Sequence, residues 1–406
     1  MTRRDTVKLF GLLGLRAVLP AKARAMPVEP PPPNDPAIAD ATLAFGCDLF
    51  GKLRAKSGNL FFSPLSIETA LAMTSGGARG ETLAEMLKTL HLPKADSQSG
   101  VGGLIRYLRS VPANQYELSI ANALWLQEGM SFRQQFLADS ARHYAASMQS
   151  VDFRQTELAR QTINHWVEKQ TKDKIKELFG PGALDKDSRL VLTNAVYFKG
   201  KWAEPFQKFQ TKDEPFHLAG GGTVQVPLMR QSGEYRYLAD DGLQAVALPY
   251  FGGRVEMMIV LPARPDGLPA VEKALTANKF KDWAARLRRS DGQVLLPRFT
   301  ATDEFNLGDT LQDLGMRRAF GKEADFGGMC DEPLMIGQVV HKAFVDTNEE
   351  GTVAAAATGV TMKPMAAPPQ PKQPFVFRAD RPFLFVIRDT GTGTPLFVGR
   401  IANPTA

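Results

Sequence analysis

The sequence predicts an α+β fold in which helices fill the first half of the chain and strands fill the second half. Two observations support this prediction. Up to about residue 179, apolar residues recur at spacings of three or four, as they do on the buried face of a helix. From Leu190 onward, apolar residues form short runs rich in β-branched and aromatic residues, which favour strands. The two kinds of segment do not alternate, which argues against a parallel βαβ sheet.

The first half of the chain predicts five helices and one short strand. The clearest helix start is Ser63-Pro64, because serine is a favoured N-cap and proline is favoured at the first helical position. Gly76-Gly77 ends that helix. Ser131 and Gln134 have the spacing of a capping box for a later helix. The helices are expected at residues 37–53, 64–75, 83–90, 131–144 and 156–179, and the strand at residues 60–62.

The second half predicts a series of strands. Residues 190–198 are nearly all apolar, so we expect a central strand that is covered on both faces. The chain ends in a predicted hairpin, because residues 383–388 and 396–401 flank a glycine- and threonine-rich turn. A short helix is expected at residues 307–314. The remaining strands are expected at residues 223–229, 234–238, 243–248, 254–261 and 293–299.

The composition is that of an ordinary globular protein, with 406 residues of which 44% are hydrophobic and 23% charged. The net charge is +6, but Lys and Arg are scattered, so we expect no nucleic-acid partner. Cys47 and Cys330 fit no metal motif, and we expect two unpaired thiols. No apolar run is long enough to span a membrane. Common hydrolase, phosphate-binding and dinucleotide-binding motifs are absent from the sequence, so we predict no enzyme, no cofactor and no metal.

The first 25 residues predict an export signal. Arg3 and Arg4 resemble the pair of a twin-arginine signal, residues 9–15 are apolar, and Ala23-Arg24-Ala25 provides a small-residue cleavage site. The alternative is a disordered basic tail. With a signal peptide at residues 1–25, the proline-rich residues 26–36 would be a disordered linker. We therefore expect an exported protein, extracellular or periplasmic.

One long segment lacks the pattern of either helix or strand. Between Val345 and Phe375 the chain runs for about thirty residues without a face that could join the core. Loops longer than about 15 residues within compact domains are usually functional or disordered. Both flanking segments are apolar strands, so this is not a domain boundary. We expect a long exposed loop that is held at both ends.

Five segments, in order and correctly spaced, resemble the signature sequences of the serpin family, and the resemblance covers nearly all of residues 37–406. It implies a single domain with three β-sheets, eight or nine helices and an exposed reactive-centre loop at about residues 349–376. It also implies a monomeric inhibitor whose partner is a serine protease. The segments are NLFFSPLSI (59–67), GARGET (77–82), TNAVYFKGKW (193–202), HKAFVDTNEEGT (341–352) and FRADRPFLF (377–385).

The resemblance also assigns roles to single residues beneath the loop. Ser63, Ser66, Asn194 and His341 match the family's polar cluster under the point where the main sheet opens. Trp202 matches the position at the top of that opening. Taken alone, each of these residues also suits a satisfied core or cap position, and both roles can hold together.

The segment after Glu349 matches the hinge of the loop, with Gly351 as the hinge glycine and Thr352 as the first residue to insert. If this segment became a strand with Thr352 facing inward, every second side chain would face the core. That inward set is small or apolar, so it can be buried at little cost: Thr352, Ala354, Ala356, Thr358, Val360 and Met362. A short helix or a flexible linker is the alternative for the alanine run. The hinge comprises Glu349, Glu350, Gly351, Thr352, Val353, Ala354, Ala355, Ala356 and Ala357.

The resemblance further implies where a protease attacks. Counting about seventeen residues from Glu349 places the attacked carbonyl at Met365, with Ala366 in the leaving fragment. Met365 favours an elastase-like or chymotrypsin-like target. The alternative bond is Lys363–Pro364 for trypsin-like enzymes, which cut poorly before proline. The implied function is a suicide-substrate inhibitor that traps the acyl-enzyme by loop insertion. The alternative is a non-inhibitory serpin that acts as a chaperone or carrier.

Overall fold

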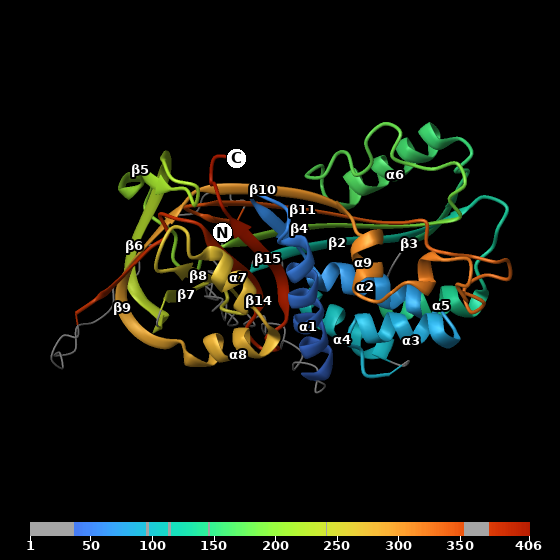
Figure 1. Ribbon diagram of the computed structural model, residues 1–406, viewed down its shortest axis with the longest axis horizontal. Coiled ribbons are helices and arrows are strands. Elements are labelled where there is room, and N and C mark those ends of the chain that lie inside the picture. Colours follow the sequence, from blue (N-terminus) through green and yellow to red (C-terminus); the bar gives the residue numbers. More distant parts are fainter. Residues whose placement is uncertain (1–35, 95–96, 113–114, 145–146, 241, 353–372) are drawn as a thin grey trace, which may run out of the picture.

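A computed structural model of the chain describes residues 36–94, 97–112, 115–144, 147–240, 242–352 and 373–406. It confirms the α+β class, with most helices in the first half of the chain and most strands in the second (Figure 1). Within the described residues there are nine α-helices. They are α1 (Pro36–Leu53), α2 (Pro64–Ser75), α3 (Gly80–Thr89), α4 (Gln98–Arg109), α5 (Gln134–Tyr144), α6 (Thr156–Gln170), α7 (Leu268–Ala274), α8 (Ala277–Arg286) and α9 (Gly308–Asp313).

A six-stranded sheet, with strand order β10-β11-β12-β4-β2-β3, positions the candidate site. Its two central long strands, β4 and β11, run parallel to each other. Strand β10 is antiparallel to β11, and β2 is antiparallel to β4 but parallel to β3. The strands are β2 (Tyr116–Gln127), β3 (Ser147–Val151), β4 (Leu190–Lys201), β10 (Phe299–Asn306), β11 (Gln338–Asn348) and β12 (Gly351–Thr352).

The other strands form a continuous nine-stranded sheet. Its longest strand, β6, pairs with β5 over residues 223–228, with β9 over residues 228–237 and with β7 over residues 236–240. In this way β6 joins β5, β9 and β13 to the strands β7, β8, β14, β15 and β1. The described residues therefore form two sheets where the resemblance implies three, because β6 joins two groups of strands into one sheet. The strands are β1 (Leu60–Phe62), β5 (Lys212–His217), β6 (Thr223–Asp240), β7 (Leu243–Pro249), β8 (Val255–Pro262), β9 (Arg288–Pro297), β13 (Phe375–Arg378), β14 (Phe383–Asp389) and β15 (Pro395–Ile401).

Helices cover both faces of the six-stranded sheet. Figure 1 shows α6 on one face and α2 to α5 on the other. Residues along β4 alternate between the two sides, as the strand period requires. Val191 and Ala195 join a small cluster under α6, whereas Leu192 and Val196 join the main core. The strand predicted at residues 190–198 is therefore central and buried on both faces, as expected.

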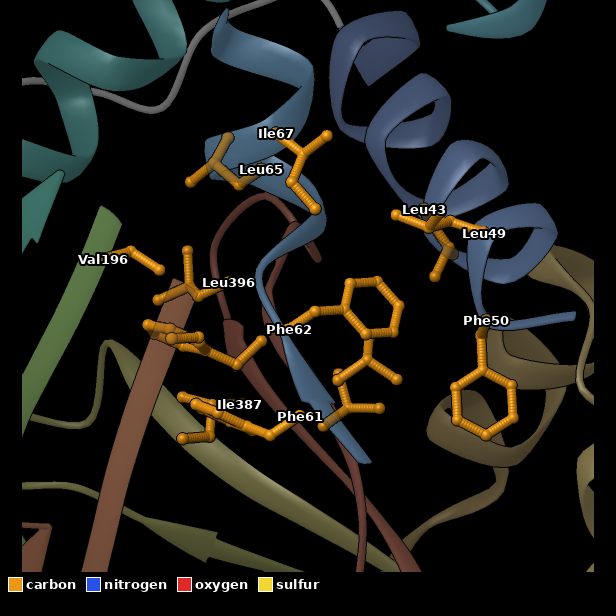
Figure 2. Close-up of a cluster of buried hydrophobic side chains, with 14 of the residues drawn as sticks. Leu43, Leu49, Phe50, Phe61, Phe62, Leu65, Ile67, Val196, Ile387 and Leu396 are labelled. Carbon is orange, nitrogen blue, oxygen red and sulfur yellow. The ribbon is translucent and has the colours of Figure 1, made fainter. Parts of the chain in front are cut away.

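The main core lies where α1 and α2 meet β1 and the C-terminal hairpin. Phe61 of β1 stacks on Phe397 of β15, with ring centroids 5.2 Å apart. Figure 2 shows Val196 of β4 beside Leu396, with Leu65 above them and Phe62 below them in this view. The N-terminus of α2 is thus fixed directly against the sheet. The predicted N-cap is confirmed, because the hydroxyl of Ser63 accepts a hydrogen bond from the Ser66 amide at 3.2 Å.

Several predicted boundaries differ from the structure. The helix expected to reach residue 179 ends at Gln170, because Lys172 and Asp173 adopt left-handed φ angles of 52° and 62°. The capping box is wrong: α5 begins at Gln134 itself, and Phe132 forms a bridge with Cys330. The strands predicted at 223–229 and 234–238 are one strand, β6. The helix α1 begins at Pro36, the last residue of the expected linker, because proline is tolerated in a first helical turn.

Other expectations concern thiols and membranes. Cys47 is half-buried and Cys330 is buried, and both are free thiols, as expected. None of the helices in the described ranges has the length and apolar character to cross a membrane. Among the same residues, no three potential ligands from His, Cys, Asp and Glu gather as a metal site would require. The export signal and residues 26–35 of the linker lie outside the described residues.

Glu68 is a fully buried acid on α2, and its surroundings favour the protonated form. The hydroxyl of Thr42 lies 3.0 Å from the carbonyl of Ile38 and also contacts Glu68 Oε2. That hydroxyl has one hydrogen, so a protonated Glu68 that donates to Thr42 satisfies both contacts. Burial raises the pKa of Glu68 to about 8. The other ionisable group in reach is the buried phenol of Tyr144 on α5, whose pKa is raised by burial and by Glu68.

This acid predicts a pH-dependent stability. A raised folded-state pKa stabilises the protein at low pH, and the contribution is lost as the pH rises from the unfolded value toward 8. We expect the free energy of unfolding of the wild type to decrease by about 1 kcal/mol per pH unit between pH 6.5 and pH 8. The thermal unfolding midpoint should fall over the same range. Glu68→Gln, which keeps an N–H donor for Thr42, is expected to abolish this slope. The exposed variant Glu128→Gln serves as the control, and an unchanged slope in Glu68→Gln would contradict the assignment.

Candidate functional site

The candidate site lies where the two central strands β4 and β11 separate. They pair directly from Gln338–Val191 to Phe344–Tyr197. Beyond that point, β12 lies between them and is antiparallel to both: Thr352 pairs with Thr347 of β11 and with Gly200 of β4. The chain therefore turns back after β11 and begins an additional strand inside the sheet.

Gly351 is the residue at which the chain enters the sheet. Its φ of +141° is rarely adopted by residues that have a side chain. A Cβ atom at this position would lie 2.1 Å from the carbonyl oxygen of Gly200 and 2.6 Å from the Cα of Lys201. Only glycine can therefore be accommodated here without displacement of β12 or β4.

The side chain of Thr352 is buried on the core side of the sheet. It is fully inaccessible, and its hydroxyl lies 2.9 Å from the hydroxyl of Tyr250. The Tyr250 ring in turn stacks on Trp202, with centroids 4.6 Å apart. Burial raises the pKa of Tyr250, so its phenol stays neutral. The Thr352 hydroxyl is therefore buried against an uncharged aromatic pair.

The segment after β4 holds the residues before Gly351 through its backbone. The amide of Trp202 donates to the carbonyl of Glu350 at 3.0 Å, and the amide of Phe206 donates to the carbonyl of Glu349 at 2.8 Å. The indole N–H of Trp202 donates to the carbonyl of Asn348 at 2.9 Å. One short segment thus satisfies three consecutive carbonyls, those of Asn348 and of the first two hinge residues, Glu349 and Glu350.

Glu349 is held by a buried ion pair. Its side chain is 3% exposed, and it accepts hydrogen bonds from Arg298 Nε at 2.8 Å and from the Thr211 hydroxyl at 2.6 Å. Burial acts to raise the pKa of Glu349, but the hydrogen bonds from Arg298 and Thr211 outweigh it and the pKa is lowered. Arg298 leads directly into β10, so the pair ties the hinge to the strand on the far side of β11.

We expect Arg298→Met to destabilise the intact protein, because the buried Glu349 carboxylate loses its cationic partner. Breaking a buried pair costs about 3–5 kcal/mol, and the partial exposure of Arg298 lowers the expected cost to about 1–3 kcal/mol. The thermal unfolding midpoint, measured by circular dichroism, should fall accordingly. Glu349→Gln should have a smaller effect, since the amide oxygen still accepts a hydrogen bond.

The pH dependence separates this effect from lost packing. Because the folded-state pKa of Glu349 is lowered, its contribution is present above the unfolded value of about 4.3 and is lost as the pH falls through the folded value. The difference between Arg298→Met and the wild type should therefore shrink in acid. A double variant with Glu349→Gln should regain part of the stability. A deficit that is equal at pH 7 and pH 3 would contradict an electrostatic origin.

A polar cluster lies beneath the paired part of β4 and β11. His341, Asn194 and Asn122 occupy matching positions on β11, β4 and β2, so they form a row across three strands. Nδ1 of His341 contacts Oδ1 of Asn194, and Nδ2 of Asn194 donates to Oδ1 of Asn122. The same Nδ2 donates to the carbonyl of Ser66 at 2.9 Å. The row is therefore attached to the first turn of α2.

The hydrogen bonds fix the tautomer of His341. The amide of Ser63 donates to its Nε2 at 3.1 Å, so that nitrogen carries no hydrogen and Nδ1–H donates to Asn194. The imidazole is fully buried and neutral, and burial lowers its pKa to about 3. A role in proton transfer near neutral pH does not fit this pKa.

This row resists the opening of the sheet. Neighbouring strands lie about 4.8 Å apart, so a strand inserted between β4 and β11 roughly doubles their separation. The bond between His341 and Asn194 must then break, together with the pairing around it. The structure thus places the short strand β12 between β4 and β11 at one end of these strands, and a hydrogen-bonded cluster farther along them.

The structure brings four of the predicted residues together: Ser63, Ser66, Asn194 and His341. Trp202 lies apart from them, beside β12. The hinge residues Glu349, Glu350, Gly351 and Thr352 are described, whereas Val353, Ala354, Ala355, Ala356 and Ala357 lie outside the described residues. So do Lys363, Pro364, Met365 and Ala366, the residues of both candidate bonds.

Sequence reasoning missed four residues that complete the site. Asn122, Tyr250, Arg298 and Thr211 all contact predicted residues directly. Asn122 lies on β2, which was not among the predicted strands. Arg298 and Thr211 are more than 50 residues from Glu349 in the chain, and no local pattern links them. A polar residue such as Asn122 within an otherwise apolar run was the one available signal.

Comparisons with known proteins agree with this geometry. Residues 40–404 match the family described as serpin (serine protease inhibitor). A serpin-like protein from Thermococcus kodakarensis is 44% identical over 90% of this chain and 86% of its own length. Bovine leukocyte elastase inhibitor is 41% identical over 90% of this chain and 99% of its own. The crystal structure of human thyroxine-binding globulin with thyroxine has a TM-score of 0.83 at 31% identity, over 91% of this chain and 99% of that one.

Proposed function

Because this chain belongs to the serpin family, we propose that it inhibits serine proteases as a suicide substrate and performs no catalysis of its own. One observation carries the proposal: β12 lies between β4 and β11, antiparallel to both, in the orientation that loop insertion requires. The similarity to leukocyte elastase inhibitor supports the same activity. We further propose an elastase-like or chymotrypsin-like target, because Met365 is an unbranched apolar residue.

In the proposed mechanism, the serine hydroxyl of the protease attacks the carbonyl of Met365. An ester bond forms to the protease, the peptide bond to Ala366 breaks, and the new amine leaves with the C-terminal fragment. The freed segment extends β12 past Thr352, and each added residue pairs with β11 on one side and β4 on the other. The attached protease is carried along the sheet, and its distorted site no longer hydrolyses the ester.

The side-chain pattern supports an energy gain on insertion. With Thr352 buried, the alternation of a strand would turn Ala354, Ala356 and Thr358 toward the core. These small side chains fit beneath a sheet without leaving a buried charge. The intact state would persist because the pairing of β4 with β11, including the bond between His341 and Asn194, must break first.

Incubation with elastase, chymotrypsin and trypsin tests the proposal. We expect an SDS-stable complex with elastase or chymotrypsin on a denaturing gel, together with a released peptide that begins at Ala366 in mass spectrometry. Boiling with hydroxylamine should cleave the complex into its two proteins, because an ester bond joins them. Complete cleavage without any complex would contradict inhibition.

A non-inhibitory serpin that binds a small molecule is the second candidate, since thyroxine-binding globulin is a structural neighbour. The two candidates differ in what cleavage does. An inhibitor should melt at a much higher temperature after its loop is cut, because the inserted strand lowers its free energy. A chain that cannot insert its loop should melt at the same temperature before and after cleavage.

We also propose that the protein is exported by the twin-arginine route. The pair Arg3 and Arg4, followed by an apolar stretch, supports this proposal. Replacing both with lysine is expected to leave the uncleaved precursor inside a bacterial host, measured by fractionation and N-terminal sequencing. Normal maturation of the double variant would contradict this route.

A further inference from the structure

A cavity of about 230 Å³ lies behind the segment that holds the hinge. Its walls come from residues 202–206, from β6, from the end of β7 and from Arg289 of β9. The described hinge residues Glu349–Thr352 do not line the cavity. The cavity is therefore distinct from the groove between β4 and β11.

Three aromatic side chains line this cavity. Trp202, Phe206 and Tyr235 are 3%, 4% and 8% exposed, and the rings of Trp202 and Phe206 meet edge to face at 6.1 Å. Leu248 and Pro249 supply an apolar wall. Aromatic faces attract cations, and several rings around one cavity are the usual way in which proteins hold a quaternary ammonium group.

The charges at the cavity also favour a cation. Glu204 and Glu234 contribute two carboxylates, and Arg289 contributes one positive charge. Arg289 pairs with Glu234 at 2.8 Å, which leaves Glu204 without an ion-pair partner within the described part of the chain. Burial and the nearby Glu204 carboxylate raise the pKa of Tyr235, which places that carboxylate within electrostatic reach of the aromatic walls.

The same residues are bonded to the hinge. The amides of Trp202 and Phe206 donate to the carbonyls of Glu350 and Glu349, and the Gln231 side chain donates to the carbonyl of Glu204 at 2.8 Å. We propose that this cavity binds a small organic cation of the quaternary-ammonium class, and that the bound cation stabilises the segment 202–206 in the conformation that holds the hinge. Binding itself does not depend on the proposed inhibitory function.

Choline is the first probe, titrated into the full-length protein by calorimetry. We expect one site per chain. The neutral isostere 3,3-dimethylbutan-1-ol has the same shape without the charge and should bind about tenfold more weakly. Glu204→Gln should weaken choline binding about fivefold and leave the affinity for the isostere unchanged. Glu323→Gln, an exposed glutamate on a different segment of the chain, is the matched control and should bind choline as the wild type does.

Amide hydrogen exchange tests the link to the hinge. Saturating choline should slow exchange at the amides of Trp202 and Phe206 at least several-fold, because these amides donate to the hinge. The effect should be absent in Glu204→Gln at the same choline concentration. Absence of choline binding, equal affinity for the isostere, or wild-type affinity in Glu204→Gln would overturn the site. Binding that leaves both exchange rates unchanged would overturn the link to the hinge.

Discussion

Thr352→Arg is expected to abolish the stable complex with a serine protease while the loop is still cut. Thr352 is fully buried, and its hydroxyl lies 2.9 Å from the hydroxyl of the neutral Tyr250. An arginine there would bury a guanidinium beside the uncharged Tyr250, at a cost of several kcal/mol. Residue 352 can then no longer occupy its buried position in the sheet, so strand insertion cannot begin. The acyl-enzyme is hydrolysed before the strand can extend.

The measurement is the number of inhibitor molecules cleaved for each protease molecule trapped. We expect this ratio to rise by at least tenfold in Thr352→Arg, with cleaved monomer replacing the complex on a denaturing gel. Val353→Arg is the matched control, because strand alternation predicts that its side chain faces away from the core. A Thr352→Arg variant that forms as much complex as the wild type would refute the insertion mechanism, and equal losses in both variants would refute the alternation.

Asn194→Ala is expected to shorten the lifetime of the intact, active form. Asn194 binds His341 on one side and Asn122 and Ser66 on the other. Its removal orphans buried polar groups and leaves a small cavity, which together cost about 2–4 kcal/mol. In the transition state, in which β4 and β11 are parted, the bond to His341 is already broken. The substitution therefore raises the free energy of the intact state more than that of the transition state. Spontaneous conversion should accelerate by about 10- to 100-fold.

The rate is followed as loss of inhibitory activity at a fixed temperature, with native gels to detect the inserted form. Asn59→Ala is the control: this half-buried asparagine bonds the backbone of Ala402 and Asn403 just after β15, and makes no side-chain hydrogen bond to β4 or β11 among the described residues. It should lower the thermal midpoint without a matching increase in conversion. If the two variants inactivate equally fast, the cluster has no specific part in holding the sheet closed.

Much of this architecture could be predicted because local signals agree with tertiary packing. Ser63-Pro64 begins α2 as predicted, since the cap satisfies the helix and also anchors it to the cluster. The run at residues 190–198 is apolar on both faces, and helices cover both faces of the strand it forms. Gly351 and Thr352 are assigned through the resemblance to the serpin hinge, and the structure leaves no room for a Cβ atom at residue 351 and buries Thr352.

The parts that escaped prediction depend on distant contacts. The helix α4 contains three glycines, which disfavour a helix, yet Gly102 is required because a Cβ there would lie 2.5 Å from the carbonyl of His143 on α5. The ion pair of Glu349 with Arg298 links residues 51 positions apart. The cavity behind Trp202 is assembled from four separate strands and segments. Contacts between residues so far apart in the chain leave no periodic pattern in the sequence from which they could be predicted.

The helix α6 rests on its own thin apolar layer, which the sheet separates from the main core. Parting β4 from β11 must therefore disrupt this layer, since Val191 and Ala195 on β4 and Val340 on β11 all belong to it. The packing of α6 on this layer therefore helps to hold β4 and β11 together. An antibody fragment that holds α6 against both strands should slow the separation of β4 and β11, and one that displaces α6 should accelerate it.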